Sequence, residues 1–150
     1  MSLEDARAVL EKAKEGALAT LHGDQPYASA TGFLFEKGNQ PRDLGTLCFF
    51  LSDLAQHTRN LKKNPKASFL IVEENPQAPI HEKRRVTLQG KVGRIEDPWK
   101  CEKLKTHYLK RFPKAEMFFK LGDFHFYEMP LKGIQWYGGF GKAEKFGATA

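Results

Sequence analysis

The chain has 150 residues, of which 41% are hydrophobic and 12% aromatic, and its formal net charge at pH 7 is +6. This length favours one domain over residues 1–150, and the apolar content is too high for a disordered chain. No apolar run approaches the ~18 residues that a membrane-spanning helix requires, and the N-terminal segment lacks the apolar core of a signal peptide. We therefore expect a cytoplasmic protein that makes no contact with a membrane.

In the first part of the chain, apolar residues at helical spacing predict a helix that begins at Ser2 and ends at Gly16. Strands are expected at residues 17–22, 27–35, 46–51 and 66–72, separated by turns rich in Gly, Pro and Asn. The second of these strands contains a run of small side chains from Ala28 to Gly32. Such a run packs weakly unless another group lies close to the backbone, and a flat ring would be such a group.

In the second part, strands are expected at residues 84–95, 124–129 and 133–137, and helices from Pro98 to Phe112 and at residues 115–121. Pro130 separates the last two strands, and the tail after Phe140 is expected to fray. Because turns join most of the strands, the pattern favours an antiparallel barrel with peripheral helices over a doubly wound parallel sheet.

The segment from Ser52 to Pro65 follows the third predicted strand and predicts a short helix capped by Asp53. A helix that begins directly after a strand directs free backbone N–H groups and the positive end of its dipole at one place, which favours an anion. Ser52, His57 and Thr58 lie at this end of the helix. We interpret them as phosphate-binding residues, and the alternative is that they only cap the helix and face solvent.

Two other candidate residues, Arg85 and Trp136, have a structural interpretation as well as a functional one. Arg85 begins the long strand on the face opposite to Val86, where it faces a cleft or protects a sheet edge. Trp136 lies in the last strand, where a core or interface position is the usual case and cofactor contact the less common one. The histidines show no metal-ligand spacing, so we expect no metal site.

Several motifs in order resemble the flavin-binding split-barrel family, whose best-known member is pyridoxamine 5′-phosphate oxidase. Most specific are Ser52-x-Leu-Ala-x-His-Thr-x-Asn-Leu, Tyr108-Leu-x-x-Phe-Pro, Asp123-Phe and Gly138-Gly-Phe-Gly-x-Ala. They are most similar to the branch that contains haem-utilisation and haem-oxygenase-like proteins. The resemblance covers most of the chain.

This resemblance implies a mainly β fold, a six-stranded antiparallel split barrel of the FMN-binding type with peripheral helices. It also implies a homodimer with FMN at the subunit interface. Carried over position by position, the implied cofactor-binding residues are Ser29, Ala30, Thr31, Phe50, Leu51, Ser52, His57, Thr58, Arg85 and Trp136. Within this set, His57 stands where many relatives have a phosphate-binding lysine, so its charge depends on the local pH.

The chain also departs from its relatives in ways that narrow the function. It lacks the C-terminal Arg-x-His region that grips pyridoxal phosphate, which argues against oxidation of vitamin B6. No histidine follows His125, so the C-terminal haem-ligating histidine of the larger haem-degrading relatives is absent too.

Three functions remain open from the sequence. We favour an FMN-dependent oxidoreductase with an unidentified small-molecule substrate and no assigned catalytic residue. The alternative on the same fold is a haem-binding or haem-degrading protein, with a ligand such as His57, His107 or His125. A module that binds nucleic acid or an acidic protein through the basic surface is a third reading, but no nucleic-acid motif supports it.

Overall fold

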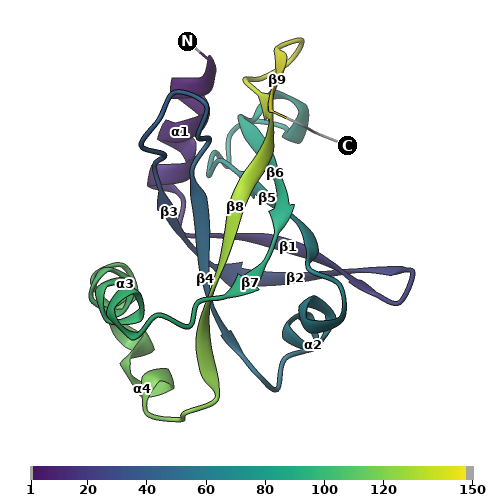
Figure 1. Ribbon diagram of the computed structural model, residues 1–150. Helices are drawn as coiled ribbons and strands as arrows, with labels where there is room; N and C mark the ends of the chain where they lie inside the picture. The colour runs from purple at the N-terminus through teal and green to yellow at the C-terminus, as the bar shows by residue number, and fades with distance from the viewer. Residues whose placement is uncertain (1, 148–150) are drawn as a thin grey trace.

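A computed structural model describes residues 2–147 and shows an antiparallel sheet with helices around it (Figure 1). The strands are β1 (Glu15–His22), β2 (Gln25–Gly32), β3 (Leu34–Glu36), β4 (Thr46–Ser52), β5 (Lys66–Val72), β6 (Arg85–Lys91), β7 (Gly93–Arg94), β8 (Phe124–Tyr137) and β9 (Ala143–Gly147). The helices are α1 (Ser2–Lys12), α2 (Gln56–Lys63), α3 (Pro98–Arg111) and α4 (Glu116–Phe119), with 3-10 turns at Ile80–Glu82 and Pro113–Ala115.

The sheet has nine strands in the order β2-β1-β5-β6-β8-β4-β3, and β7 and β9 pair with β8 outside this path. All of the recorded strand pairs are antiparallel. Figure 1 shows β8 running the length of the molecule while β1 and β2 cross it, so the sheet is strongly curled. This confirms the predicted mainly β, antiparallel fold with helices at the periphery.

Two apolar clusters hold the sheet together. The larger cluster lies inside the curl, under α1, and its fully buried members include Phe33, Phe49 and Phe69. The smaller one lies on the other face of β4 and β8, where α3 and α4 cover Phe50 and Phe126. Because successive residues of a strand point to opposite faces, β4 contributes Phe49 to one cluster and Phe50 to the other.

The prediction of two strands around Pro130 was wrong, since β8 continues through this proline. Proline has no N–H to donate, but Pro130 lies where β8 exchanges β4 for β6 as its partner. The pairing of β6 shifts by a bulge between Gln89 and Gly90 at the same level. The following Leu131 N–H donates to Gly45 O at 2.8 Å, so the ladder resumes at once.

Other boundaries also differ from the prediction. The expected strand at residues 27–35 is divided at Phe33 into β2 and β3, and the expected strand at residues 84–95 is divided at Val92 into β6 and β7. Residues 143–147, expected to fray, form β9 against β8, whereas the rest of that tail, residues 148–150, lies outside the described residues. Within residues 2–147, no helix has the length and apolar composition that crossing a bilayer demands.

Candidate functional site

A hydrogen bond joins β2 to α2 at the predicted phosphate site. Ser29 Oγ lies 2.9 Å from His57 Nδ1, although 28 positions separate the two residues. Both side chains are half-buried, so each retains some surface toward solvent. The structure therefore brings together two of the residues that the resemblance assigns to the cofactor, and His57 is the one interpreted as a phosphate ligand.

The N-terminus of α2 presents backbone donors beside this pair. Arg59 N–H makes the first bond back along the helix, to Ala55 O at 3.2 Å. The N–H groups of Gln56 and His57 precede it, have no carbonyl partner inside the helix and belong to half-buried residues. Ala55 is the N-cap and provides no side-chain cap bond. These N–H groups and the helix dipole favour an anion at this end of α2.

The prediction that Asp53 caps this helix was wrong. Ser52 closes the preceding turn instead, since its Oγ accepts the Leu54 N–H at 3.1 Å and donates to Asp123 Oδ2 at 2.9 Å. Asp53 contacts two distant residues, His125 Nε2 at 3.1 Å and Lys62 Nζ at 3.6 Å. These contacts, and not the helix end, engage the Asp53 carboxylate.

Burial lowers the pKa of His57 below its ordinary value because desolvation disfavours the imidazolium. The ring is therefore mainly neutral at pH 7 before any anion is bound, and Nδ1 either accepts the Ser29 hydroxyl proton or donates to its oxygen. In this state the pair contributes hydrogen bonds and no full charge. The positive potential at the site must come from the helix dipole and from nearby basic residues of α2.

Three of the predicted cofactor residues have almost no accessible surface. Thr58 is 0% exposed, Leu51 1% and Trp136 3%. A side chain without surface cannot touch a ligand, so these residues shape the barrel beneath the site and we leave them out of the proposed contacts. Thr58 Oγ1 is nonetheless buried without a recorded hydrogen-bond partner.

The remaining predicted residues lie at different places on the sheet. On β2, Ala30 is exposed and Thr31 is half-buried, with Thr31 Oγ1 donating to Gly32 O at 3.2 Å. Arg85 is on the face opposite to the buried Val86, as predicted. Its guanidinium donates to Ile80 O at 2.9 Å and lies 4.8 Å from the centre of the Tyr137 ring. The 3-10 turn thus holds Arg85, and no contact joins it to the Ser29–His57 pair.

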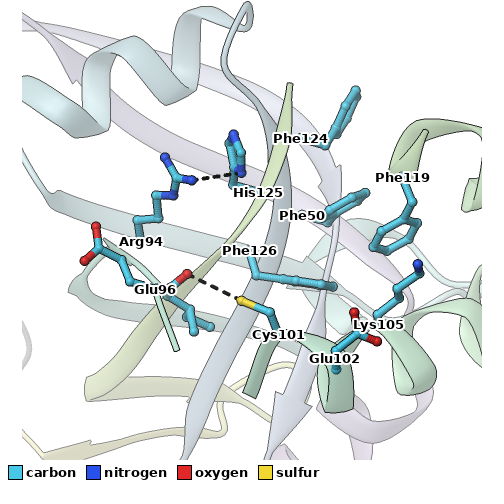
Figure 2. A pocket seen from close by; sticks show the side chains of 11 residues that line it. Phe50, Arg94, Glu96, Cys101, Glu102, Lys105, Phe119, Phe124, His125 and Phe126 are labelled. Carbon is cyan, nitrogen blue, oxygen red and sulfur yellow. Dashed lines mark hydrogen bonds between the residues drawn. The ribbon is translucent and has the colours of Figure 1, made fainter. Parts of the chain in front are cut away.

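Phe50, the last of the predicted residues, lies in an aromatic pocket of about 420 Å³ between β4, β8 and the helices α3 and α4 (Figure 2). The rings of Phe119, Phe124 and Phe126 also line it, and Phe50 stacks on Phe119 with 4.1 Å between ring centres. Lys105 Nζ lies 5.1 Å from the centre of the Phe119 ring. This pocket is suited to a flat apolar group.

A polar chain that the sequence analysis missed forms the other side of this pocket. Arg94 Nη2 donates to His125 Nδ1 at 3.1 Å, and His125 Nε2 donates to Asp53 Oδ2 at 3.1 Å (Figure 2 shows the first of these bonds). This arrangement assigns the ring proton to Nε2. The only sequence signal was the pair of polar positions, Asp53 and His125, at the ends of two strand-forming runs, and their proximity depends on the pairing of β4 with β8.

The residues around Ser29 and His57 offer hydrogen bonds to a phosphate group, but no full positive charge. Hydroxyl, imidazole and backbone N–H donors converge where β2 meets α2. No lysine or arginine is bonded to the Ser29–His57 pair. The site therefore suits a phosphate that is held by hydrogen bonds and a helix dipole.

Comparison with known proteins places this geometry in a family. The family model described as CREG, beta-barrel matches residues 2–149. The chain belongs to the CREG beta-barrel family. No match was found among curated proteins.

Solved structures similar to this CREG beta-barrel chain include proteins that bind haem and a protein that binds a flavin. A haem-binding protein from Mycobacterium smegmatis is 27% identical, with a TM-score of 0.84, over 98% of this chain and 58% of its own. The chain thus spans less than two thirds of the length of that protein. HutZ, a haem storage protein from Vibrio cholerae, is 23% identical with a TM-score of 0.71, over 93% of this chain and 98% of its own.

The third comparison is with an FAD-binding protein from Mesorhizobium loti. It is 17% identical with a TM-score of 0.70, over 89% of this chain and 90% of its own. At this identity the likeness concerns the fold alone. The predicted resemblance to split-barrel proteins, including those of haem utilisation, is confirmed.

Proposed function

We propose that this protein binds FMN as a homodimer and acts as a flavin-dependent oxidoreductase. The observation that supports the proposal is the 2.9 Å contact between Ser29 and His57, which joins β2 to the N-terminal turn of α2. The resemblance assigns His57 to the flavin phosphate and Ser29 to the same cofactor, and the two residues come from segments whose proximity no local pattern requires. Flavin-binding neighbours on the same fold agree with it.

In this proposal the protein provides position and polarity. The Ser29 hydroxyl, the His57 ring and the N–H groups that begin α2 hold the phosphate. The exposed, small side chains of β2, such as Ala30, leave room for a ring close to the backbone. When bound, FMN supplies the hydride or electron transfer, and the chain needs no general acid or base of its own for that step.

An exposed apolar face is compatible with the homodimer. On β5, Leu70 is 40% and Val72 36% exposed, and both point away from the face of the buried Phe69 and Ile71. The strand β2 is also at one end of the sheet order, where an unpaired edge invites a second chain. Burial of this face against its copy would cover these apolar residues.

A titration with FMN tests the proposal. We expect the purified protein to quench flavin fluorescence at saturation, with one FMN per chain. Ser29→Ala and His57→Ala should each weaken binding about tenfold, since each removes a hydrogen bond to a charged group. His107→Ala, an exposed histidine of α3, is the matched control and should bind as the parent does. Lack of any saturable FMN uptake by the parent protein would contradict the proposal.

Haem is the second candidate ligand, favoured by the 27% identical haem-binding protein. The aromatic pocket contains His125, but both of its ring nitrogens are engaged, by Arg94 and by Asp53. Iron ligation at His125 would have to break one of these bonds. A Soret band that appears on adding hemin and is lost in His125→Ala would favour this candidate, whereas an unchanged band would exclude His125 as the ligand.

A further inference from the structure

A second cavity, of about 340 Å³, lies beside α2 at the end of β1. Six residues line it: His22, Gln56, Arg59, Asn60, Lys62 and Lys63. Arginine and lysine make up half of the lining, and no carboxylate belongs to it. The volume is at the lower end of the ~300–1,000 Å³ that ligand sites usually have. The walls are mostly the carbon stems of these side chains, so a small anion would be held by their cationic ends and not by the walls.

A chain of hydrogen bonds fixes the polar groups of this cavity. Asn60, which is 2% exposed, donates through Nδ2 to Thr20 Oγ1 at 3.0 Å and accepts Gln56 Nε2 at 2.7 Å. Gln56 Oε1 in turn accepts Arg59 Nη2 at 2.8 Å. The guanidinium is thus connected to the core of the barrel, whereas a solvating surface arginine has no such support. A fixed arginine loses less conformational entropy when it binds a ligand.

The cavity is distinct from the Ser29–His57 pair. Gln56, Arg59, Asn60 and Lys63 are spaced by three, four and seven positions and share one face of α2, while His57 points to β2. Arg59 also donates to Leu54 O at 3.0 Å, and its planar group can still donate to an anion.

The cations of the cavity are not equally available. Lys62 Nζ lies 3.6 Å from Asp53 Oδ1, so this lysine is partly neutralised by a carboxylate that also contacts His125. Arg59 contacts neutral oxygens only, and it contributes with Lys63 most of the uncompensated positive potential. We therefore expect Arg59 and Lys63 to dominate the affinity for an anion.

We propose that this cavity binds the diphosphate group of a small molecule. Two cationic side chains on one helical face, Arg59 and Lys63, match an anion with two charged centres better than a single phosphate. The basic groups surround a cavity and do not form a stripe with exposed aromatics, which argues against a nucleic-acid strand. The site goes beyond the proposed FMN function and does not require it, because its contacts belong to a different face of α2.

Calorimetric titration of the full chain with sodium pyrophosphate, with inorganic phosphate for comparison, tests the proposal. We expect saturable binding of one pyrophosphate per chain, at least about tenfold tighter than that of phosphate, because the second charged centre makes its own charged hydrogen bonds. Arg59→Ala should weaken it about tenfold and Gln56→Ala about threefold, since the latter only releases the guanidinium. The flavin spectrum provides a separate readout, so failure of FMN binding and failure of this site are distinguishable.

Lys66→Ala is the matched control, because Lys66 is an exposed lysine of β5 that belongs to the same basic stretch of sequence but not to the cavity. The control should bind pyrophosphate as the parent does. Equal weakening by Lys66→Ala and Arg59→Ala would mean that the attraction is diffuse surface electrostatics, and this would overturn the proposal. Absence of saturable pyrophosphate binding at low salt would overturn it as well, as would tighter binding of a short oligonucleotide than of pyrophosphate.

Discussion

Ser29 and His57 are hydrogen bonded at 2.9 Å, and this contact connects the edge strand β2 to the helix that follows β4. No feature of either segment requires this proximity. It arises because β2 pairs with β1, against which α2 packs through the Asn60–Thr20 hydrogen bond. The barrel therefore assembles a donor group from two segments that are far apart in the chain.

The lowered pKa of His57 predicts a specific pH dependence of stability. Because burial depresses this pKa below its ordinary 6.5, the unfolded chain binds the proton at a higher pH than the folded chain does. The free energy of unfolding is thus greatest above the pKa that His57 has in the unfolded chain. It falls as the pH drops from there toward the pKa that His57 has in the folded chain. His57→Gln should flatten this part of the curve of unfolding free energy against pH between about pH 8 and about pH 5.5. Urea denaturation at several pH values measures it, with His107→Gln as the control; an unchanged slope in His57→Gln would contradict the assignment.

The contact between Asp53 and His125 should contribute a measurable coupling energy. The two atoms Oδ2 and Nε2 are 3.1 Å apart and join the turn before α2 to the start of β8. A double-mutant cycle with Asp53→Ala and His125→Ala should give about 1 kcal/mol of coupling in the free energy of unfolding. The same cycle between Asp53 and Lys62 should give less, because the Lys62 side chain is 54% exposed and its Nζ lies 3.6 Å from the carboxylate. A coupling energy of zero between Asp53 and His125 would mean that hydrogen bonds to water replace this contact without loss of stability.

The aromatic cluster between the sheet and helices α3 and α4 should depend on Phe50. This ring is 7% exposed, and its centre lies 4.1 Å from that of Phe119 and 4.8 Å from that of Phe126. Phe50→Ala should destabilise the fold by about 3–5 kcal/mol, through lost burial and the cavity that remains. Phe118→Ala provides a control in a neighbouring ring that is 38% exposed, and it should cost less than half as much. Equal losses for the two variants, measured by denaturant unfolding, would show that Phe50 is not central to the cluster.

Local signals in the sequence predicted some elements well. Helix α3 begins at Pro98 after Asp97, whose side chain accepts the Trp99 N–H at 3.0 Å, because proline and a capping aspartate act within one turn. The strand β5, Lys66–Val72, also has its predicted bounds. The start of α2 was misplaced because the best local cap, Asp53, has a partner 72 positions away.

The candidate site depended on more than local signals. Ser29 was assigned by resemblance and not by any property of a serine in a strand, and the structure brings it to His57. Arg94 was missed because a lone arginine carries no pattern, and His125 was considered only as a possible haem ligand. The pairing of β7 and β4 with β8 brings the two residues to one pocket. Pairings between distant strands thus determine what a sequence pattern alone could not specify.

The glycine at position 16 is required by a contact between strands and not by a helix end. The sequence suggested that it ends the first helix, but α1 ends at Lys12 and Gly16 lies in β1, opposite to Thr31. A Cβ at this position would lie 2.5 Å from Leu70 O and 2.7 Å from Phe69 Cε2, so a backbone oxygen and a buried ring occupy the space. Gly16→Ala should therefore destabilise the protein by about 1–3 kcal/mol, because the β1–β5 pairing would have to widen.

Gly93 provides the matched control for this substitution, since nothing lies within 4 Å of a Cβ placed there. Gly93→Ala should be neutral or slightly stabilising, by about 0.4–1 kcal/mol at most, because alanine restricts the unfolded chain. Urea unfolding followed by circular dichroism measures the free energy of unfolding of the two variants and the parent. The comparison uses one common slope of this free energy against urea concentration. If Gly16→Ala were as stable as Gly93→Ala, the close approach of β1 to β5 would not be what selects glycine at position 16.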